Sequence, residues 1–364
     1  MQRFDASHPY FYLMEVAFED TIPLGWHVDL TYRCDLACVH CYLEDRKREE
    51  LTLEEYEQFF ADLAEAGCLY LLISGGDIFV RKDALDILWA AARHRFDMTL
   101  ITHAMAIDDY TADQIAEMGI RLVATSVYHT DPEIHDRVTL REGSFERTIA
   151  GLRRLKERGV QISIKCPIFD INAGAEKTIP ALAEELGAVL QLAPIIRGGN
   201  DGSDKLLSLN MDLDGKANVY DCLFSEWERL EAMPKFSAEQ RTCLAGHASG
   251  YLSPDGTIQP CLDYERSAGN IREQRFSEIW KHSPLLNRLR GIRRKDFGGC
   301  NSCDNNSFCS LCPALADRET GDPTGSAPSK CRESTAIRYA FDRKEAEQEA
   351  EGFDLFDAFG LTSR

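Results

Sequence analysis

The chain has 364 residues, of which 44% are hydrophobic, so it can bury a large core and still leave room for a second, smaller domain. Lys and Arg supply 41 side chains against 60 from Asp and Glu, which gives a net charge of -19. This charge repels phosphate backbones and anionic lipids, so neither nucleic acid nor a membrane is an expected partner. No run approaches the roughly 20 apolar residues that cross a bilayer, and the N-terminus lacks the order of a secretion signal, so we predict a cytoplasmic protein.

Short β-branched runs alternate with helical periodicity from Trp26 to about Ile196. The predicted strands are WHVDLTY (26–32), YLLIS (70–74), MTLIT (98–102), RLVATSVY (121–128), VQISIKCPI (160–168) and AVLQLAPII (188–196), and the helices between them begin near Thr52, Lys82, Thr111, Ser144 and Ala175. Strands separated by such helices pair in parallel through right-handed crossovers. We therefore predict an α/β fold, a partial (β/α)6 TIM-like barrel that binds its ligands at the C-terminal ends of the strands.

Composition divides the rest of the chain. We expect an N-terminal extension over 1–23, the barrel over 24–215, a bridging helix over 216–240, a small cysteine-rich domain over 241–335 and an acidic tail over 336–364. Long apolar runs vanish in the cysteine-rich region, so we expect metal bonds rather than a core to hold its shape. The tail is expected to be a solvated helix or a frayed end.

Thirteen cysteines indicate metal ligation, because cytoplasmic thiols are kept reduced and seldom form structural disulfides. Three of them crowd one early segment, and seven lie in the last third of the chain: Cys34, Cys38 and Cys41, then Cys243, Cys261, Cys300, Cys303, Cys309, Cys312 and Cys331. The remaining three, Cys68, Cys166 and Cys222, are expected to lie in the core.

The segment Cys34-x3-Cys38-x2-Cys41 follows the first predicted strand, in the loop where such a sheet places its active site. Three thiolates on one loop can each bind a corner of a [4Fe-4S] cube, which leaves the fourth iron open. The alternative is a structural zinc site. Zinc requires a fourth ligand, and His40 is badly placed for that role between Val39 and Cys41.

This spacing, with the aromatic Tyr42 beside the last cysteine, resembles the signature of the radical S-adenosylmethionine (SAM) superfamily. The resemblance implies that the methionine amino and carboxylate groups of SAM chelate the open iron. It also implies that reductive cleavage of SAM yields a 5'-deoxyadenosyl radical, which abstracts a hydrogen from the substrate. In such an enzyme the cofactor carries the chemistry, and the protein orients it and excludes water.

Further matches to the family end the next three strands. The segment Ser74-Gly75-Gly76-Asp77 is similar to the Gly-Gly-Glu-Pro loop that receives the methionine amino group, with Asp and Ile here in place of Glu and Pro. Thr102-His103-Ala104 takes the place of Thr-Asn-Gly, and Ser126 takes that of a polar residue that contacts the ribose, although it can also be an ordinary strand-end serine. The resemblance implies a cofactor site made of Tyr42, Ser74, Gly75, Gly76, Asp77, His103 and Ser126.

Alternation on the fifth predicted strand turns Ile162 and Ile164 toward the helices and Ser163 and Lys165 into the barrel. A buried lysine needs an anionic partner. Lys165 is therefore a candidate catalytic residue that holds a carboxylate of substrate or SAM, and the alternative is a salt bridge to a neighbouring acidic side chain.

The later cysteines run Cys243, Gly256-x4-Cys261, Cys300-x2-Cys303-x5-Cys309-x2-Cys312 and Cys331, an order that resembles the SPASM domain of radical SAM enzymes. That domain holds two auxiliary [4Fe-4S] clusters. The resemblance implies one cluster on Cys243, Cys261 and Cys312 and a second on Cys300, Cys303, Cys309 and Cys331. The family usually has three residues, where this chain has two, between its fifth and sixth cysteines. Zinc ribbons also use paired C-x2-C motifs and remain an alternative.

Enzymes that combine these two domains mostly modify peptides, and the segments 128–145 and 194–203 look most like the peptide maturases. The resemblance implies oxidative modification of a precursor peptide, such as a thioether or carbon–carbon crosslink, with a reductase, flavodoxin or ferredoxin as electron donor. The residues before the first strand are too few for a leader-binding domain, so a discrete leader-binding protein or the acidic tail is expected to recognise the leader.

Two other functions remain open at this point. One is side-chain modification of a tetrapyrrole of the heme pathway, although the Gly-Arg-Gly-like strand end expected of such relatives is not evident after Ile195. The other is a non-enzymatic iron–sulfur electron carrier or a zinc-stabilised binding module, which leaves the glycine loop and the six-unit sheet unexplained.

Overall fold

The computed structural model describes residues 9–43, 45–199, 203–223 and 237–350, which are organised around one sheet of nine strands. The strands are β1 (Gly25–Asp29), β2 (Tyr70–Ser74), β3 (Asp97–Ile101), β4 (Leu122–Ser126), β5 (Gln161–Pro167), β6 (Val189–Ala193), β7 (Ser249–Leu252), β8 (Thr257–Gln259) and β9 (Gly269–Asn270). Their order across the sheet is β6-β5-β4-β3-β2-β1-β7-β8-β9. Strands β1 to β7 pair in parallel, and β8 and β9 pair antiparallel.

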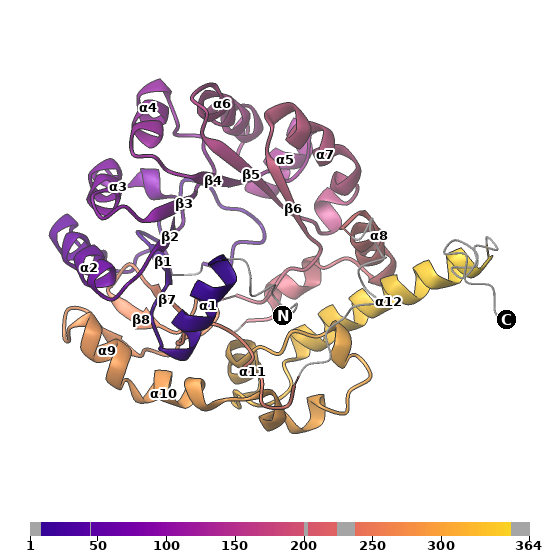
Figure 1. The fold of residues 1–364 in the computed structure, drawn as a ribbon. Helices are drawn as coiled ribbons and strands as arrows, with labels where there is room; N and C mark the ends of the chain where they lie inside the picture. Colours follow the sequence, from indigo (N-terminus) through magenta and orange to yellow (C-terminus); the bar gives the residue numbers. More distant parts are fainter. Residues whose placement is uncertain (1–8, 44, 200–202, 224–236, 351–364) are drawn as a thin grey trace.

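Helices cover the outer face of the curved sheet (Figure 1). Those of the first half are α1 (Pro9–Glu19), α2 (Leu53–Glu65), α3 (Ala84–Ala92), α4 (Asp109–Glu117), α5 (Pro132–Thr139), α6 (Ser144–Glu157), α7 (Ala175–Leu186) and α8 (Leu213–Leu223). Those of the second half are α9 (Phe276–His282), α10 (Pro284–Gly291), α11 (Pro313–Thr320) and α12 (Pro328–Ala350). Short 3-10 helices are η1 (Ile78–Val80), η2 (Asp170–Asn172), η3 (Lys205–Leu209), η5 (Arg294–Asp296), η6 (Gly298–Cys300) and η7 (Asn306–Phe308).

The predicted partial barrel is confirmed: six parallel strands alternate with helices and do not close, since β6 is an edge strand. Local signals placed the elements well. Thr52 and Glu55 form the expected capping box at the start of α2, and the strand YLLIS is β2. Helices α1 and α5 were not predicted, and neither were α9, α10 and α11 in the cysteine-rich region. The signal for α5 was Asp131 followed by Pro132, an N-cap residue before proline in the first turn.

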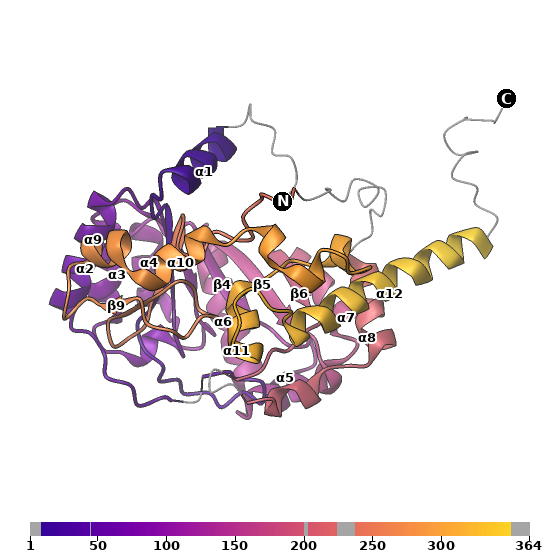
Figure 2. The ribbon, with the colours of Figure 1, turned by 90° about the horizontal axis from the view of Figure 1, so that it is seen from below.

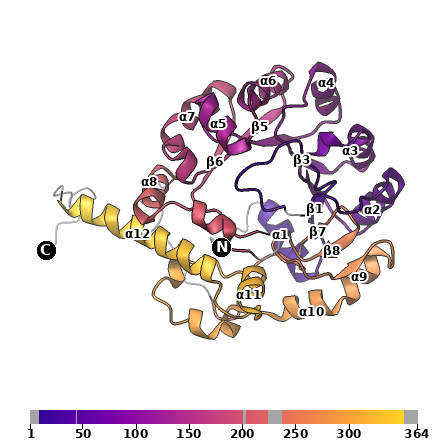
Figure 3. The same cartoon turned by 180° about the vertical axis from the view of Figure 1, so that it is seen from behind.

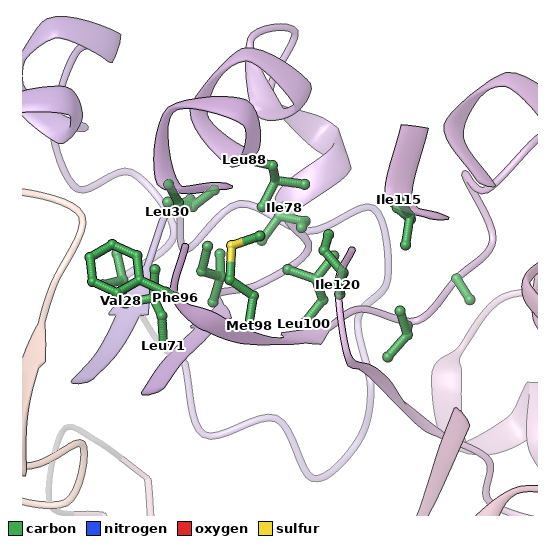
Figure 4. Packing of buried hydrophobic residues seen from close by; sticks show 14 of the residues in the cluster. Val28, Leu30, Leu71, Ile78, Leu88, Phe96, Met98, Leu100, Ile115 and Ile120 are labelled. Carbon is green, nitrogen blue, oxygen red and sulfur yellow. The ribbon is translucent and has the colours of Figure 1, made fainter. Parts of the chain in front are cut away.

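The main core lies between the outer face of the sheet and the helices. Figure 4 shows part of it around β1, β2 and β3, where Val28, Leu71 and Met98 belong to the same apolar cluster as Leu88 of α3. Ile162, Ile164 and Cys166 join this core, as does Cys68. The predictions for Cys68 and Cys166 are therefore confirmed.

The prediction for Cys222 was wrong, because this thiol is exposed near the end of α8. The buried face of α8 carries Ala217 and Tyr220, which pack on Ala336 and Ala340 of α12.

The expectation that the cysteine-rich region lacks a core was wrong for its first part. Strand β7 extends the barrel sheet beside β1, and Leu252, Ile258, Phe276 and Trp280 belong to the main core. These apolar residues are separated by turns, so the sequence contains no long apolar run that would indicate a core in this region. Smaller apolar clusters support the remainder, where Phe297 and Leu311 pack against partly buried cysteines.

Two of the predicted boundaries fall inside helices. The boundary at 215 and 216 lies within α8, whose described part ends at Leu223, and the rest of the predicted bridging helix lies largely outside the described residues. The boundary at 335 and 336 lies within α12, which crosses the molecule beside α8 (Figures 1 and 2). The start of the acidic tail is therefore a packed helix rather than a frayed end. The described residues contain no helix both long and apolar enough to span a bilayer.

Candidate functional site

Cys34, Cys38 and Cys41 lie on the loop that follows β1, at the C-terminal end of the parallel strands. Burial raises the pKa of Cys34 to about 12 and that of Cys38 to about 11. The neighbouring Cys38 contributes to the first shift and Cys41 to the second, so the three sulfurs form one group. Thiolates in this environment require a compensating cation, which a bound metal supplies.

The spacing of the sulfurs distinguishes a cluster from a single ion. Zinc–sulfur bonds of about 2.3 Å in a tetrahedron hold the sulfurs about 3.8 Å apart. Among the described residues, no three cysteine sulfurs lie within 4.8 Å of one another. The His40 ring packs between Tyr128 and Phe169, with centroids 5.0 and 5.3 Å away, and its Nε2 lies 3.4 Å from the Tyr128 hydroxyl. The donor set therefore fits a multi-iron cube better than one zinc ion.

The loop is fixed to its surroundings at several points that the sequence did not reveal. Val39 donates its N–H to Val138 of α5 at 2.9 Å, and Asp35 accepts hydrogen bonds from Arg141 and from His103 Nε2, the latter at 2.6 Å. Cys34, Asp35 and His103 offer ligand atoms within 4.8 Å of one another. The Asp35 carboxylate already accepts hydrogen bonds from Arg141 and His103. We therefore assign it the role of holding the loop in place rather than that of a metal ligand.

The glycine loop after β2 lies directly against the chain that leads into the cysteine loop. A Cβ on Gly75 would sit 2.3 Å from the carbonyl oxygen of Thr31, and Gly75 also has φ of +148°. A Cβ on Gly76 would sit 2.3 Å from the carbonyl oxygen of Arg33. These positions therefore need glycine because two backbones touch here.

Asp77 is 1% exposed and joins the ends of two strands. Its Oδ1 accepts the N–H of Phe79 at 2.9 Å, and its Oδ2 accepts the Thr102 hydroxyl at 2.6 Å and the N–H of His103 at 3.0 Å. The structure thus gives Asp77 a scaffolding function, and its contact with SAM stays a prediction.

Substitution Asp77→Asn is expected to lower the free energy of unfolding by about 1 to 3 kcal/mol, because an amide nitrogen cannot accept bonds from these buried donors. Urea unfolding of the purified protein measures the change. Exposed Asp86→Asn in α3 is the matched control and should cost less than about 1 kcal/mol, since it loses only a charge in the first turn of the helix. Equal stability of both variants would contradict the scaffolding role.

Ser126 and Lys165 lie beside each other on the inner face of the barrel. They are register partners on β4 and β5, and Lys165 is in turn paired with Gln191 of β6. Burial lowers the pKa of Lys165. None of the described residues forms a salt bridge or hydrogen bond with its ammonium group, so the salt-bridge alternative is not supported there.

A buried polar network also lines this inner face, and the sequence analysis missed it. The Tyr251 hydroxyl donates to Asp29 at 2.8 Å and lies 2.7 Å from the Tyr32 hydroxyl, and His27 Nε2 lies 3.0 Å from Asp29. Tyr42 is partly buried near Asp29, Cys41 and Tyr32, and desolvation raises its pKa well above the usual value. The period of two on β1, which sets His27 and Asp29 opposite Trp26 and Val28, was the available signal.

The later cysteines separate into two groups in space. Cys243, Cys261 and Cys312 line one cavity of about 590 Å³ with apolar neighbours such as Leu289 and Ile292. Burial raises the pKa of Cys309 to about 11, with further contributions from Cys300 and Cys331, and Cys303 lies close enough to Cys300 to raise its pKa in the same way. This division matches the one that the SPASM resemblance implies, while the ligand roles stay predictions.

Comparison with known proteins agrees with this geometry. Residues 28–173 match the family model described as the radical SAM superfamily, and residues 243–305 match SPASM, an iron-sulfur cluster-binding domain. The chain belongs to the radical SAM superfamily. It is therefore a radical SAM oxidoreductase with a SPASM domain, which uses SAM and a [4Fe-4S] cluster together with auxiliary iron–sulfur clusters. The electron-carrier and zinc-module alternatives are thereby overturned.

Two curated relatives of this radical SAM enzyme carry different names. An AdoMet-dependent heme synthase of Oleidesulfovibrio alaskensis is 27% identical over 88% of this chain and 89% of its own length. The mycofactocin maturase MftC of Mycobacterium ulcerans is 27% identical over 87% of this chain and 89% of its own. The structure of Streptococcus suis SuiB bound to precursor peptide SuiA shares the fold, with a TM-score of 0.70, 18% identity and coverage of 90% of this chain and 82% of SuiB.

Proposed function

We propose that this radical SAM enzyme oxidatively modifies a ribosomally made peptide, forming a thioether, a carbon–carbon crosslink or a related bond. The observation that carries the proposal is the open edge of the barrel. Strand β6 ends the sheet, and its residues alternate between exposed and half-buried, with Val189 61% exposed. Leu190 and Leu192 pack on the core, so Val189, Gln191 and Ala193 face the open interior.

Among the described residues, no strand pairs with the outer edge of β6, and such an edge beside a polar interior suits an extended peptide. Its free N–H and C=O groups can pair with a peptide backbone, and alternate side chains of that peptide then point toward the inner face. Gln191 lies beside Lys165 and Ser126 on that face. The names of two similar proteins support the choice, since MftC is a maturase and SuiB binds a precursor peptide.

Each predicted site residue receives a proposed role on this basis. Cys34, Cys38 and Cys41 hold the SAM-binding cluster, and the backbone of Ser74, Gly75 and Gly76 receives the methionine end of SAM. His103, Ser126 and Tyr42 complete the cofactor site, with Asp77 supporting the loop. The bound cofactor supplies a carbon-centred radical that removes a substrate hydrogen. The proposed auxiliary ligand sets are Cys243, Cys261 and Cys312, and Cys300, Cys303, Cys309 and Cys331.

Lys165 is proposed to hold a carboxylate of SAM or substrate inside the barrel. Substitution Lys165→Met is expected to weaken that binding about tenfold or more, because a charge-assisted hydrogen bond is lost in a partly buried site. Titration of the reduced holoenzyme with SAM and with peptide identifies which ligand loses affinity. Exposed Lys177→Met in α7 is the control, and unchanged affinity for both ligands would remove Lys165 from the site.

The test of the proposed function is anaerobic turnover of the reconstituted enzyme with dithionite, SAM and the short peptides encoded beside its gene. Mass spectrometry should show a peptide that has lost two hydrogens, formed together with 5'-deoxyadenosine. Release of 5'-deoxyadenosine without any change in those peptides would count against a peptide substrate.

A tetrapyrrole is the second candidate substrate, because a heme synthase is among the most similar relatives. The same assay with a porphyrin that carries propionate side chains discriminates between the two. Decarboxylated or otherwise oxidised porphyrin, with no modified peptide, would replace the peptide proposal by this one.

The partners of the reaction are part of the proposal. A reductase, flavodoxin or ferredoxin is proposed to reduce the cluster in place of dithionite, and a discrete leader-binding protein is proposed to present the peptide. A tight, leader-dependent complex of this chain alone, which survives deletion of residues 351–364, would contradict the need for such a protein.

A further inference from the structure

A small cavity lies beside the open edge of the barrel, and none of the residues that line it belongs to the cysteine loop. It has a volume of about 230 Å³ and is bordered by the residues that follow β6, by η3 and α8, and by the first turns of α12. Figure 3 shows α8 and α12 next to each other on this side of the molecule. Ile195 and Ile196 form its apolar wall.

Most polar side chains of this cavity already have partners. The Asn210 amide holds the backbone of Ile196 on both sides, with bonds of 3.0 and 2.8 Å. Ser329 donates its hydroxyl to Glu319, and Glu333 pairs with Lys330. Within the described residues, these groups are therefore not available to a ligand without breaking existing bonds.

Lys216 and Arg332 differ from the others. Lys216 is only 9% exposed and lines the cavity, and no described residue forms a hydrogen bond or ion pair with its ammonium group. Arg332 also lines the cavity without such a partner in the described part of the chain. Asp170 and Asp212 are near enough to influence Lys216 electrostatically, but neither lies within ion-pair distance of it among the described residues.

Burying an unpaired ammonium group beside a guanidinium group is unfavourable. Desolvation lowers the pKa of Lys216 and the charge of Arg332 lowers it further, while Asp170 and Asp212 offset only part of this shift. Glu333 is the carboxylate that lines the cavity, and it is already paired with Lys330. A bound anion would offset both the desolvation of the Lys216 ammonium group and its repulsion by Arg332.

We infer that this cavity binds a carboxylate group of the substrate, with Lys216 and Arg332 as its two cationic donors. The inference rests on the proposed function and deepens it, because the cavity is next to the edge strand along which a peptide would lie. The carboxylate can belong to an acidic side chain of a peptide or to the propionate of a tetrapyrrole, and both have the same chemistry at this site. The volume suits such a group rather than a whole substrate.

Binding to the reconstituted full-length enzyme tests the inference with two probe pairs. The first pair is a fluorescent, end-capped pool of peptides that carry one Glu, and the same pool with Gln in its place. The second pair is a propionate-bearing porphyrin and its methyl ester. We expect Lys216→Met and Arg332→Gln each to weaken binding of the acidic member of one pair about tenfold or more. Neither variant should change binding of the neutral member.

Thermal unfolding separates a ligand role from a structural one. If Lys216 serves a ligand, Lys216→Met removes an unpaired buried charge, so the variant should unfold at an equal or higher temperature than the parent. Exposed Lys177→Met is the control for both measurements. A lower melting temperature with unchanged affinity for both acidic probes would overturn the inference.

The outcomes also separate this inference from the proposed function. If the variants lose affinity only for the acidic peptide pool, the result supports both a carboxylate site in this cavity and a peptide substrate. If the variants lose affinity only for the propionate-bearing porphyrin, the result supports the carboxylate site and overturns the peptide substrate. Equal affinities of parent and variants for all four probes overturn the cavity, while peptide modification in the turnover assay would still stand.

Discussion

Replacing Cys34, Cys38 and Cys41 together by alanine is expected to abolish the release of 5'-deoxyadenosine from SAM. These thiols follow β1 as one group, and no other described cysteine shares their loop. The variant should still bind auxiliary clusters through the SPASM domain, so its iron content should fall by about one third rather than to zero. Iron analysis and a chromatographic assay of 5'-deoxyadenosine measure the two effects on the same sample.

Cys222→Ala is the control for this triple substitution, because its thiol is exposed near the end of α8 and belongs to neither cysteine group. It should retain the full iron content and full SAM cleavage. Full 5'-deoxyadenosine release by the triple variant would contradict the assignment of the loop. Complete loss of iron would show that the SPASM domain does not assemble clusters on its own.

Gly76→Ala is expected to reduce SAM cleavage about a hundredfold without removing any ligand. The new Cβ would sit 2.3 Å from the carbonyl oxygen of Arg33, so either the glycine loop or the start of the cysteine loop must move. A displacement of about 1 Å in a site that orients reactants can decrease the rate by about two orders of magnitude. The added strain should also lower the free energy of unfolding by about 1 to 3 kcal/mol.

Gly291→Ala provides the matched control, since a Cβ there meets no atom within 4 Å and the residue ends helix α10. It should match the parent in both stability and rate. Gly76→Ala could decrease SAM cleavage either by displacing SAM or by loss of the cluster, and the iron content distinguishes these two causes. We expect the clusters to be retained and only SAM cleavage to be lost. If the Gly76→Ala variant cleaved SAM at the parent rate, the close approach of the two backbones would not be required for SAM cleavage.

Local signals explain why the barrel could be predicted. The strand YLLIS is largely apolar and lies between Gly67 and Gly75, and the capping box at Thr52 marks the start of α2. On β5, the alternation of Ile162 and Ile164 with Lys165 fixed which side chains face the helices. Such patterns act over a few neighbours, and the parallel order follows from the connecting helices.

Contacts between distant segments could not be predicted in the same way. Nothing local pairs Tyr251 with Asp29, which are 222 residues apart, or sets β7 beside β1. The prediction for Cys222 was wrong because a cysteine in a helix can lie on either face, and packing on α12 decides which face of α8 is buried. Asp77 was taken for a cofactor ligand from its motif, while its three hydrogen bonds to Phe79, Thr102 and His103 became visible only in the fold.

The central claim is that SAM binds directly to an open iron of the cluster held after β1. Electron–nuclear double resonance of the dithionite-reduced enzyme, with SAM labelled with nitrogen-15 in its methionine amino group, tests it most directly. We predict a hyperfine coupling between that nitrogen and the reduced cluster, absent from the variant without Cys34, Cys38 and Cys41. A reduced cluster on this loop with no coupling to the labelled nitrogen would contradict the account.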